Sequence, residues 1–350
     1  MILYPPGLRN AAGKGLMKKR DLLLTTALLL AALAPACHTS EATRLREIAT
    51  ETRKGDAAAS VSTPLPLAAS TPVQLATLED RKVKESSGLV ASRRSPGLFW
   101  THNDSGAGPL LHAFDRDGRR RGVWRVAGAA AIDWEDVAAG PGPQPGRQYL
   151  YVGDIGDNER RRAEVVVYRV AEPEITLADA QTSARAPRET EPAEVLRLRY
   201  PDGAHDAEAL LVHPSSGDLY VVTKEIGGGT AGVYKLAAPA APSVYTLKRV
   251  GEVRLPVLFG GLVTGGDISP DGRRVVLCDY TGGYEFSLPG GGGGAAEFDG
   301  VWGRAPLTID LGERRQGEAV CYAADGESVF ATSEKRPAPL IEVRREASKK

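Results

Sequence analysis

The sequence holds few of the residues that mark the commonest kinds of enzyme site. Only 3 of its 350 residues are cysteine and only 5 are histidine, and they form no cluster with the spacing of a zinc site. No Gly-x-Ser-x-Gly segment is present, which argues against a serine hydrolase of that type. The glycine run 290–294 is followed by no Lys-Ser or Lys-Thr pair, so it does not have the pattern of a phosphate-binding loop.

Charge of one sign and long apolar runs are also missing. The 44 basic and 44 acidic residues balance, and this argues against a nucleic-acid partner. The apolar run Leu22–Leu33 is shorter than the roughly 20 residues that cross a bilayer. The sequence has 40 glycines instead, with many short runs of Val, Leu and Tyr between turn residues. That composition favours an all-β fold.

The N-terminus has the organisation of an export signal. Met17–Arg20 supply positive charge, Leu22–Leu33 form the apolar segment, and small residues precede Cys37. The end of the segment resembles a bacterial lipobox with Cys37 as the lipidated first residue, although Leu33 lies four places before the cysteine instead of three. The alternative is a secretory signal cleaved near Ala36. Both predict an exported protein, held in the periplasm or at the cell surface by a lipid anchor or else secreted.

The chain is predicted to have four parts. They are a signal segment, a flexible tether attached at Cys37, a folded domain and a short tail, at residues 1–36, 37–71, 72–345 and 346–350. Residues 1–16 fit no part of a signal, so we expect translation to begin at Met17. The tether is rich in Ala, Ser, Thr and Pro, and such a composition buries too little apolar surface to fold. If Cys37 is lipidated, Cys278 and Cys321 remain, and they can pair or stay free.

One two-strand pattern returns five times in the folded domain. Each copy runs from an acid through an apolar strand, a Pro/Gly/Asp turn and a second strand to another acid, over residues 85–104, 135–154, 208–225, 267–279 and 318–334. Because a tight hairpin returns the chain to the end it left, both acids of each copy are expected at the same end. The closing acids are Asp104, Asp154, Glu225, Asp279 and Glu334.

The strand count predicts a single β-propeller. Two further strands follow each of the first four hairpins, which gives the four strands of a propeller blade. Only residues 339–345 follow the fifth, so its missing strand is expected from residues 72–83. Closure by the N- and C-terminal strands removes the open sheet edges. We therefore predict five blades, and segments 155–205 and 226–265 leave room for a sixth.

Such a ring would gather the hairpin acids at one mouth of its central channel. Carboxylates held this close repel unless they are protonated, paired or bound to a cation. Oxygen ligands from several loops suit Ca²⁺, which takes 6–8 oxygens in irregular geometry. The predicted metal ligands are Glu85, Asp104, Glu135, Asp154, Asp157, Glu208 and Glu318. The alternative is a structural ring in which acids pair with bases such as Lys224, Lys335 and Arg160–Arg162.

Two histidines are candidate catalytic bases. His102 and His205 each stand beside acids of the same mouth, in the segments HND and HDAE. A histidine next to carboxylates is oriented as a base or stabilised as an imidazolium, and it could activate water for hydrolysis. The alternative is that these side chains cap loops or lie on the surface.

Several short motifs carry a family resemblance. ESSGL, HNDSG, DWEDVA, YVGDIGDN, DAEALLV, DISPDGRRV and QGEAV, spread over about residues 83–336, together resemble a family of exported bacterial β-propeller proteins and lipoproteins. More distantly they resemble phytase-like and esterase-like propellers. The resemblance implies calcium in an acidic channel mouth and a hydrolytic activity. The clustered Lys and Arg expected for phosphate in a propeller phytase are few here.

Two functions of different classes follow from the sequence. The first is metal-dependent hydrolysis of a phosphoester, ester or lactone at the Ca²⁺-binding mouth. The second is a non-catalytic binding or scaffold propeller of the cell envelope. A glycosidase with paired carboxylates is a third reading. The expected partner is a small molecule or an envelope ligand at the mouth, with the membrane reached only through the lipid anchor and the protein acting as a monomer.

Overall fold

The computed structural model describes residues 71–257, 260–289 and 297–345. The predicted signal segment, Cys37, the tether up to residue 70, the glycine run and the predicted tail lie outside the described residues. Among the residues described, no helix is long and apolar enough to cross a membrane.

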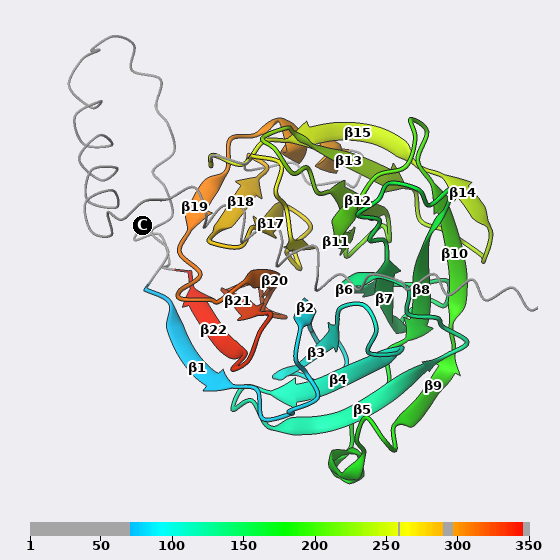
Figure 1. Ribbon diagram of the computed structural model, residues 1–350, viewed down its shortest axis with the longest axis vertical. Helices are drawn as coiled ribbons and strands as arrows, with labels where there is room; N and C mark the ends of the chain where they lie inside the picture. The colour runs from blue at the N-terminus through cyan, green and yellow to red at the C-terminus, as the bar shows by residue number, and fades with distance from the viewer. Residues whose placement is uncertain (1–70, 258–259, 290–296, 346–350) are drawn as a thin grey trace, which may run out of the picture. The chain divides into compact units, whose positions relative to one another are not determined.

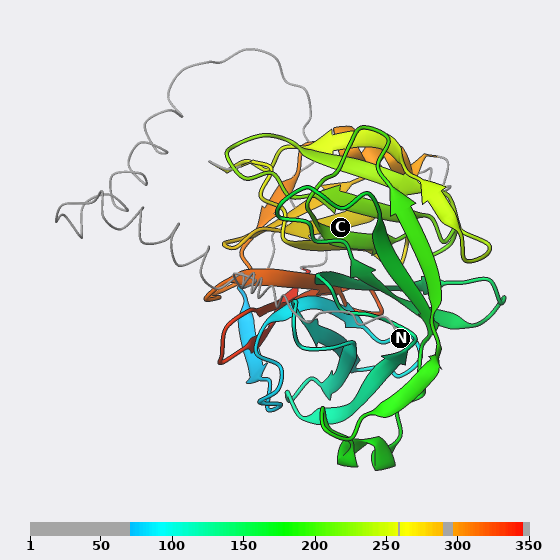
Figure 2. The ribbon, with the colours of Figure 1, turned by 45° about the vertical axis from the view of Figure 1, so that its right-hand side comes forward.

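The described chain forms five small sheets around one axis, and the fold is a five-bladed β-propeller (Figure 1). This confirms the all-β prediction and the count of five, and the described ranges contain no sixth blade. The innermost strands are β2, β6, β11, β16 and β20, and each contacts the innermost strands of both neighbouring blades. Figure 2 shows the same blades from a second direction, with the first and last colours of the folded chain side by side.

Each blade runs from its innermost strand outward. Blades 1 and 2 consist of β2 (Ser86–Ala91), β3 (Leu98–Asn103), β4 (Leu110–Asp115), β5 (Arg120–Ala127) and of β6 (Trp134–Pro141), β7 (Gln148–Asp154), β8 (Val165–Ala171), β10 (Glu194–Arg199). Blades 3 and 4 consist of β11 (Ala207–Val212), β12 (Leu219–Thr223), β13 (Ala231–Leu236), β15 (Lys248–Val253) and of β16 (Gly265–Ile268), β17 (Arg274–Cys278), β18 (Gly283–Ser287), β19 (Leu307–Ile309). Blade 5 consists of β20 (Gly317–Tyr322), β21 (Ser328–Ser333), β22 (Pro339–Arg344) and β1 (Val73–Thr77).

The ring closes through both ends of the folded domain, as predicted. Strand β1 pairs antiparallel with β22, from Val73 opposite Glu342 to Thr77 opposite Pro339. The N-terminal strand therefore forms the outer edge of a blade whose other three strands come from the C-terminus. This pairing covers the edge of β22, which would otherwise offer unpaired backbone groups to another chain.

Deletion of residues 72–77 is expected to lower the melting temperature by on the order of 10 °C, because several backbone hydrogen bonds and the closure of the ring are lost together. Thermal unfolding of the purified protein measures the change. Deletion of six tether residues, 60–65, is the matched control and should leave the melting temperature unchanged. Equal melting temperatures for the two deletions would contradict the closure.

Two short strands were not predicted. Strand β9 (Arg188–Pro192) follows β8 in the chain but pairs parallel with β5 of blade 1. Strand β14 (Val244–Thr246) precedes β15 but pairs parallel with β10 of blade 2. Blades 2 and 3 thus each send a short strand back to the edge of the blade before them. These strands lie in the two long segments that left room for a sixth blade. The short helices η1 (Leu177–Gln181) and η2 (Phe298–Gly303) also lie in inter-strand segments.

Apolar faces of neighbouring blades pack on one another and form the core. Between blades 1 and 2, Trp100, Trp124 and Trp134 are at most 1% exposed and belong to one apolar cluster. The rings of Trp100 and Trp124 meet edge to face at 4.9 Å. Cys278 and Cys321 are buried and free. The propeller is therefore held by packing and not by a disulfide between these two residues.

Buried aspartates also join the innermost strands of neighbouring blades. The Asp136 carboxylate of β6 accepts the Leu210 N–H of β11 at 2.9 Å, and that of Asp267 in β16 accepts the Tyr322 N–H of β20 at 2.9 Å. Burial raises the pKa of Asp136 well above its ordinary value and that of Asp267 to about 6. Asp267 was expected among the acids of the mouth. The structure gives it this inter-blade role instead.

Candidate functional site

A β-bulge occurs near the start of four of the five innermost strands. The pairing of each of these strands with its neighbour shifts by one residue, and the extra residue is Ser87, Glu135, Glu208 or Glu318. A bulge leaves one residue out of the ladder and redirects its side chain, which is why bulges are frequent beside functional sites. Three of the four bulged residues are glutamates, so the backbone itself places carboxylates at equivalent positions around one end of the ring.

Blades 1 and 2 bring three carboxylates together. Asp104 directly follows β3, Asp133 directly precedes β6, and Glu135 is the bulged residue of β6. One oxygen from each lies within 4.8 Å of the others. Two oxygens bound at 2.3–2.6 Å on opposite sides of one Ca²⁺ are separated by at most about 5 Å, so this spacing suits shared ligation of that ion. We call Asp104, Asp133 and Glu135 the acid triad.

Gly156 leaves room for two of these carboxylates. A Cβ at this position would overlap Glu135 Oε1 and Asp133 Oδ2. The glycine N–H donates to the Asp133 carbonyl at 3.2 Å, and its own carbonyl accepts Arg162 Nη1 at 2.8 Å. The backbone of Gly156 is thus fixed against the acid triad. The predicted ligand set contained Asp104 and Glu135 but lacked Asp133, although all three acids stand in the motifs that were singled out.

Asp154 and Asp157 form hydrogen bonds in the segments next to the acid triad. The Asp154 side chain is buried and accepts the N–H groups of Ile132 and Asp133 at 3.0 and 3.2 Å, while Arg162 Nη1 lies 2.9 Å from it. Asp157 accepts the Arg162 N–H at 2.7 Å. Both were predicted as metal ligands. In the structure the Asp154 carboxylate is bonded to two backbone amides and to Arg162, and one Asp157 oxygen accepts a backbone amide. Asp154 thereby holds the segment that carries Asp133, and Asp157 holds the loop that carries Arg162.

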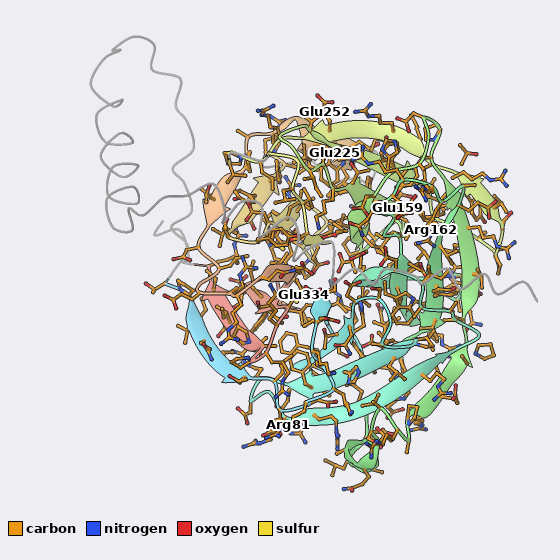
Figure 3. All side chains as sticks on the ribbon, in the orientation of Figure 1. Arg81, Glu159, Arg162, Glu225, Glu252 and Glu334 are labelled. Carbon is orange, nitrogen blue, oxygen red and sulfur yellow. The ribbon has the colours of Figure 1, made fainter. Side chains whose placement is uncertain are left out.

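Blades 3 and 5 contribute a second group of acids to the same end. Glu208 lies in contact with the ammonium of Lys224, and both side chains are 7% exposed. The Gln316 side-chain amide donates to Glu318 Oε1 and to Glu334 Oε2, each at 2.7 Å. We call Glu208, Lys224, Gln316, Glu318 and Glu334 the proton cluster. Figure 3 shows Glu334 near the middle of the ring.

The proton cluster binds protons more tightly than exposed acids do. Burial raises the pKa of Glu334 to about 7 and that of Glu208 to about 8. The pKa of Glu318 is raised well above its ordinary value by burial and by the neighbouring Glu334. Burial opposes the charge of Lys224, but the carboxylates around it keep its pKa well above the usual value. Glutamates that retain protons near neutral pH are suited to general acid–base catalysis.

The acid triad and the proton cluster share one negative field. Besides burial, the charges of Asp104, Glu208 and Glu85 each raise the pKa of Glu334. Glu85 also forms a backbone bridge with Glu334, which joins blade 1 to blade 5. The predicted acids Glu85, Asp104, Glu135, Glu208 and Glu318 therefore lie at one end of the propeller. Glu85 and Asp104 connect the acid triad with the proton cluster, because the charges of both act on Glu334.

Both predicted histidines have polar contacts outside the acid triad and the proton cluster. His102 is fully buried, its Nδ1 lies 3.0 Å from the Asn103 carbonyl, and burial lowers its pKa to about 4. His205 Nε2 lies 3.0 Å from Asp202 Oδ1 and 3.0 Å from the Tyr234 hydroxyl. His102 is thus a neutral core residue at neutral pH. His205 belongs to a cluster of tyrosine and aspartate side chains.

Two of the closing acids have local partners. Glu225 Oε2 accepts Arg160 Nη2 at 2.6 Å. Asp279 accepts the N–H groups of Thr281 and Gly282, each at 2.7 Å, and therefore caps the turn before β18. These contacts follow the structural alternative stated above. Of the other closing acids, Asp104 belongs to the acid triad, Glu334 belongs to the proton cluster, and Asp154 is paired with Arg162.

The fold and the site together define a five-bladed propeller with an acidic mouth. No protein-family model and no curated protein matches the chain. Among solved structures, the chain is similar to the PQQ-bound aldose sugar dehydrogenase of Streptomyces coelicolor, with 11% identity and a TM-score of 0.46 over 80% of this chain and 99% of that one. It is also similar to hydrazine synthase of Kuenenia stuttgartiensis, with 13% identity and a TM-score of 0.39 over 75% and 72%. Likeness at this level carries no argument about the site.

Proposed function

We propose that this protein is an exported propeller that binds one Ca²⁺ at the acid triad and hydrolyses a phosphoester, ester or lactone at the same mouth. The observation that carries the proposal is the approach of the Asp104, Asp133 and Glu135 oxygens to within 4.8 Å of one another over the backbone of Gly156. Three carboxylates are hard ligands of the kind that Ca²⁺ prefers. Asp154 and Arg162 support the proposed site by fixing the loop between them.

In the proposed chemistry the acid triad and the proton cluster have different roles. A cation at the acid triad would polarise the scissile group. In blade 5, burial raises the pKa of Glu334 to about 7, so this side chain retains a proton near neutral pH, and Gln316 fixes its orientation. In this proposal Glu334 and Glu318 exchange a proton with water or the leaving group. They take the role that the sequence suggested for His102 or His205.

The second candidate is a binding or scaffold propeller of the cell envelope, in which a cation only holds the loops of the mouth. The engagement of His102 and His205 elsewhere favours it, because neither predicted base then stands ready at the mouth. In either case we propose that Cys37 carries a lipid anchor and that the protein acts as a monomer on a small molecule or envelope ligand.

Turnover of phosphate monoesters, carboxylic esters and lactones, with and without EDTA, tests the proposed function. We expect one class to be hydrolysed, EDTA to abolish the activity and Ca²⁺ to restore it. Glu334→Gln should lower kcat by about 100-fold or more, as loss of a general acid–base group does. Glu327→Gln, at an exposed site in blade 5, is the matched control. If EDTA lowers the melting temperature but no class is hydrolysed, the scaffold function is correct.

A further inference from the structure

A separate pocket opens beside the mouth in blade 1. It has a volume of about 250 Å³, and its lining includes Lys82, Lys84, Glu85, Asn103, Ser105 and His112. The segment before β2 forms one wall, and the loop between β3 and β4 forms another. Asn103 is the residue next to Asp104, so the pocket adjoins the acid triad along the chain.

His112, which lines this pocket, is paired with Asp80. His112 Nδ1 lies 2.9 Å from Asp80 Oδ2, and the histidine side chain is 2% exposed. Burial raises the pKa of Asp80, but hydrogen bonds from the His112 ring and the Lys82 N–H outweigh it and lower the pKa overall. The ionised Asp80 therefore fixes a proton on His112 Nδ1. Within the described residues, His112 Nε2 is buried and has no hydrogen-bond partner. A buried polar atom without a partner costs free energy, and a ligand that bonded to it would remove this cost.

Two ammonium groups stand at the same pocket without a fixed counter-charge. Neither Lys82 nor Lys84 belongs to an ion pair within the described residues. Their backbone is nevertheless held in place, because Asn103 Oδ1 accepts the Lys84 N–H at 2.7 Å and Asn103 Nδ2 donates to the Lys82 carbonyl at 2.9 Å. The wall that carries both lysines is thus fastened to the end of β3. Glu85 is the one carboxylate in the lining, on the side where blade 1 meets Glu334.

We propose that this pocket binds the phosphoryl group of a small molecule. Lys82 and Lys84 would pair with its oxygens, and His112, whose Nδ1 proton is held by Asp80, would accept at Nε2 a hydrogen bond from a phosphoryl hydroxyl. The volume exceeds that of a phosphate ion, so the rest of the ligand has room beside Glu85. This inference needs no cation at the acid triad. It assigns an anion site in a propeller whose mouth is otherwise acidic.

Titration of the exported domain with inorganic phosphate, in the presence of EDTA, tests the site by calorimetry. We expect saturable binding that sulfate reduces by competition and that acetate does not match. The double substitution Lys82→Ala and Lys84→Ala should weaken it about tenfold or more, because it removes two charge-assisted contacts. Replacement of Lys248 and Arg304 by alanine removes the same charge from exposed positions in other blades and should have little effect.

Two single variants separate a loss of phosphate affinity from a loss of stability. His112→Gln removes the ring of a buried residue, so its melting temperature is measured beside its affinity, and the exposed Lys84→Ala is tested alone. Absence of phosphate binding, or equal binding by the lysine variants and the wild type, would overturn the proposal. Binding that requires Ca²⁺ and disappears in Glu135→Gln would also overturn it, because phosphate would then sit on the cation. Failure of the proposed hydrolysis leaves these outcomes unchanged.

Discussion

Replacing Gly156 with alanine is expected to weaken Ca²⁺ binding about tenfold or more while leaving the propeller folded. The added Cβ would overlap Glu135 Oε1 and Asp133 Oδ2, so both carboxylates would have to turn away from their present positions. Because a cation site depends on the distances between its oxygens, the displaced pair can no longer ligate one ion together with Asp104. Calorimetric titration of the purified domain with Ca²⁺ measures the loss.

Two further variants are measured in the same way for comparison. Gly303→Ala adds the same methyl group where no atom lies within 4 Å, so its Ca²⁺ affinity should equal that of the wild type. Glu135→Gln keeps the shape of the side chain and removes its charge, so it should lose as much affinity as Gly156→Ala. Unchanged affinity in both Gly156→Ala and Glu135→Gln would show that the acid triad holds no cation.

Substitution of Glu334 by glutamine is expected to flatten the dependence of stability on pH. Glu334 has an ordinary pKa of 4.5 and a pKa of about 7 in the folded protein. Below pH 4.5 both states hold the proton. As the pH rises toward 7, the unfolded chain ionises first, and the stability that the bound proton gives to the folded state is lost. A shift of this size corresponds to up to about 3 kcal/mol in the free energy of unfolding.

Denaturant unfolding of wild type and Glu334→Gln between pH 5 and pH 8 measures this effect. The free energy of the variant relative to the wild type should increase across the range, and Glu327→Gln should follow the wild type. Ca²⁺ should reduce the difference, because the charge of Asp104 contributes to the raised pKa of Glu334. Parallel curves for wild type and Glu334→Gln would mean that Glu334 ionises as an ordinary glutamate.

The sequence is sufficient to predict the architecture. Apolar strands joined by Pro/Gly/Asp turns mark each hairpin, and Gly217, Gly272 and Gly326 have positive φ between the first and second strands, as such turns require. The unmatched strand at residues 72–83 predicts closure, since an open propeller would leave an exposed edge. Strand β9 was missed because its sequence, RETEP, is polar and carries no sign of a parallel partner in another blade.

The details of the site depend on register, which composition does not reveal. Glu135 and Asp136 are neighbours, yet one is the bulged residue of the acid triad and the other is bonded to Leu210 in the next blade. Side chains alternate between the two faces of a strand, but a bulge shifts this alternation. The face on which each residue lies can therefore be assigned only when the position of the bulge is known. Asp154 could not be separated from the ligands for a similar reason. Its partner Arg162 reaches it from a loop, and loop conformation is not encoded in strand periodicity.

Ca²⁺ titration of the purified protein at pH 6 and at pH 8 tests the central claim most directly. If the carboxylates of blades 1, 2, 3 and 5 share one field around the axis, one Ca²⁺ binds per molecule, its affinity is higher at pH 8, and binding releases protons, because cation and protons compete for the same charge. Binding with the same affinity at both pH values and without proton release, or no saturable binding at either, would contradict it.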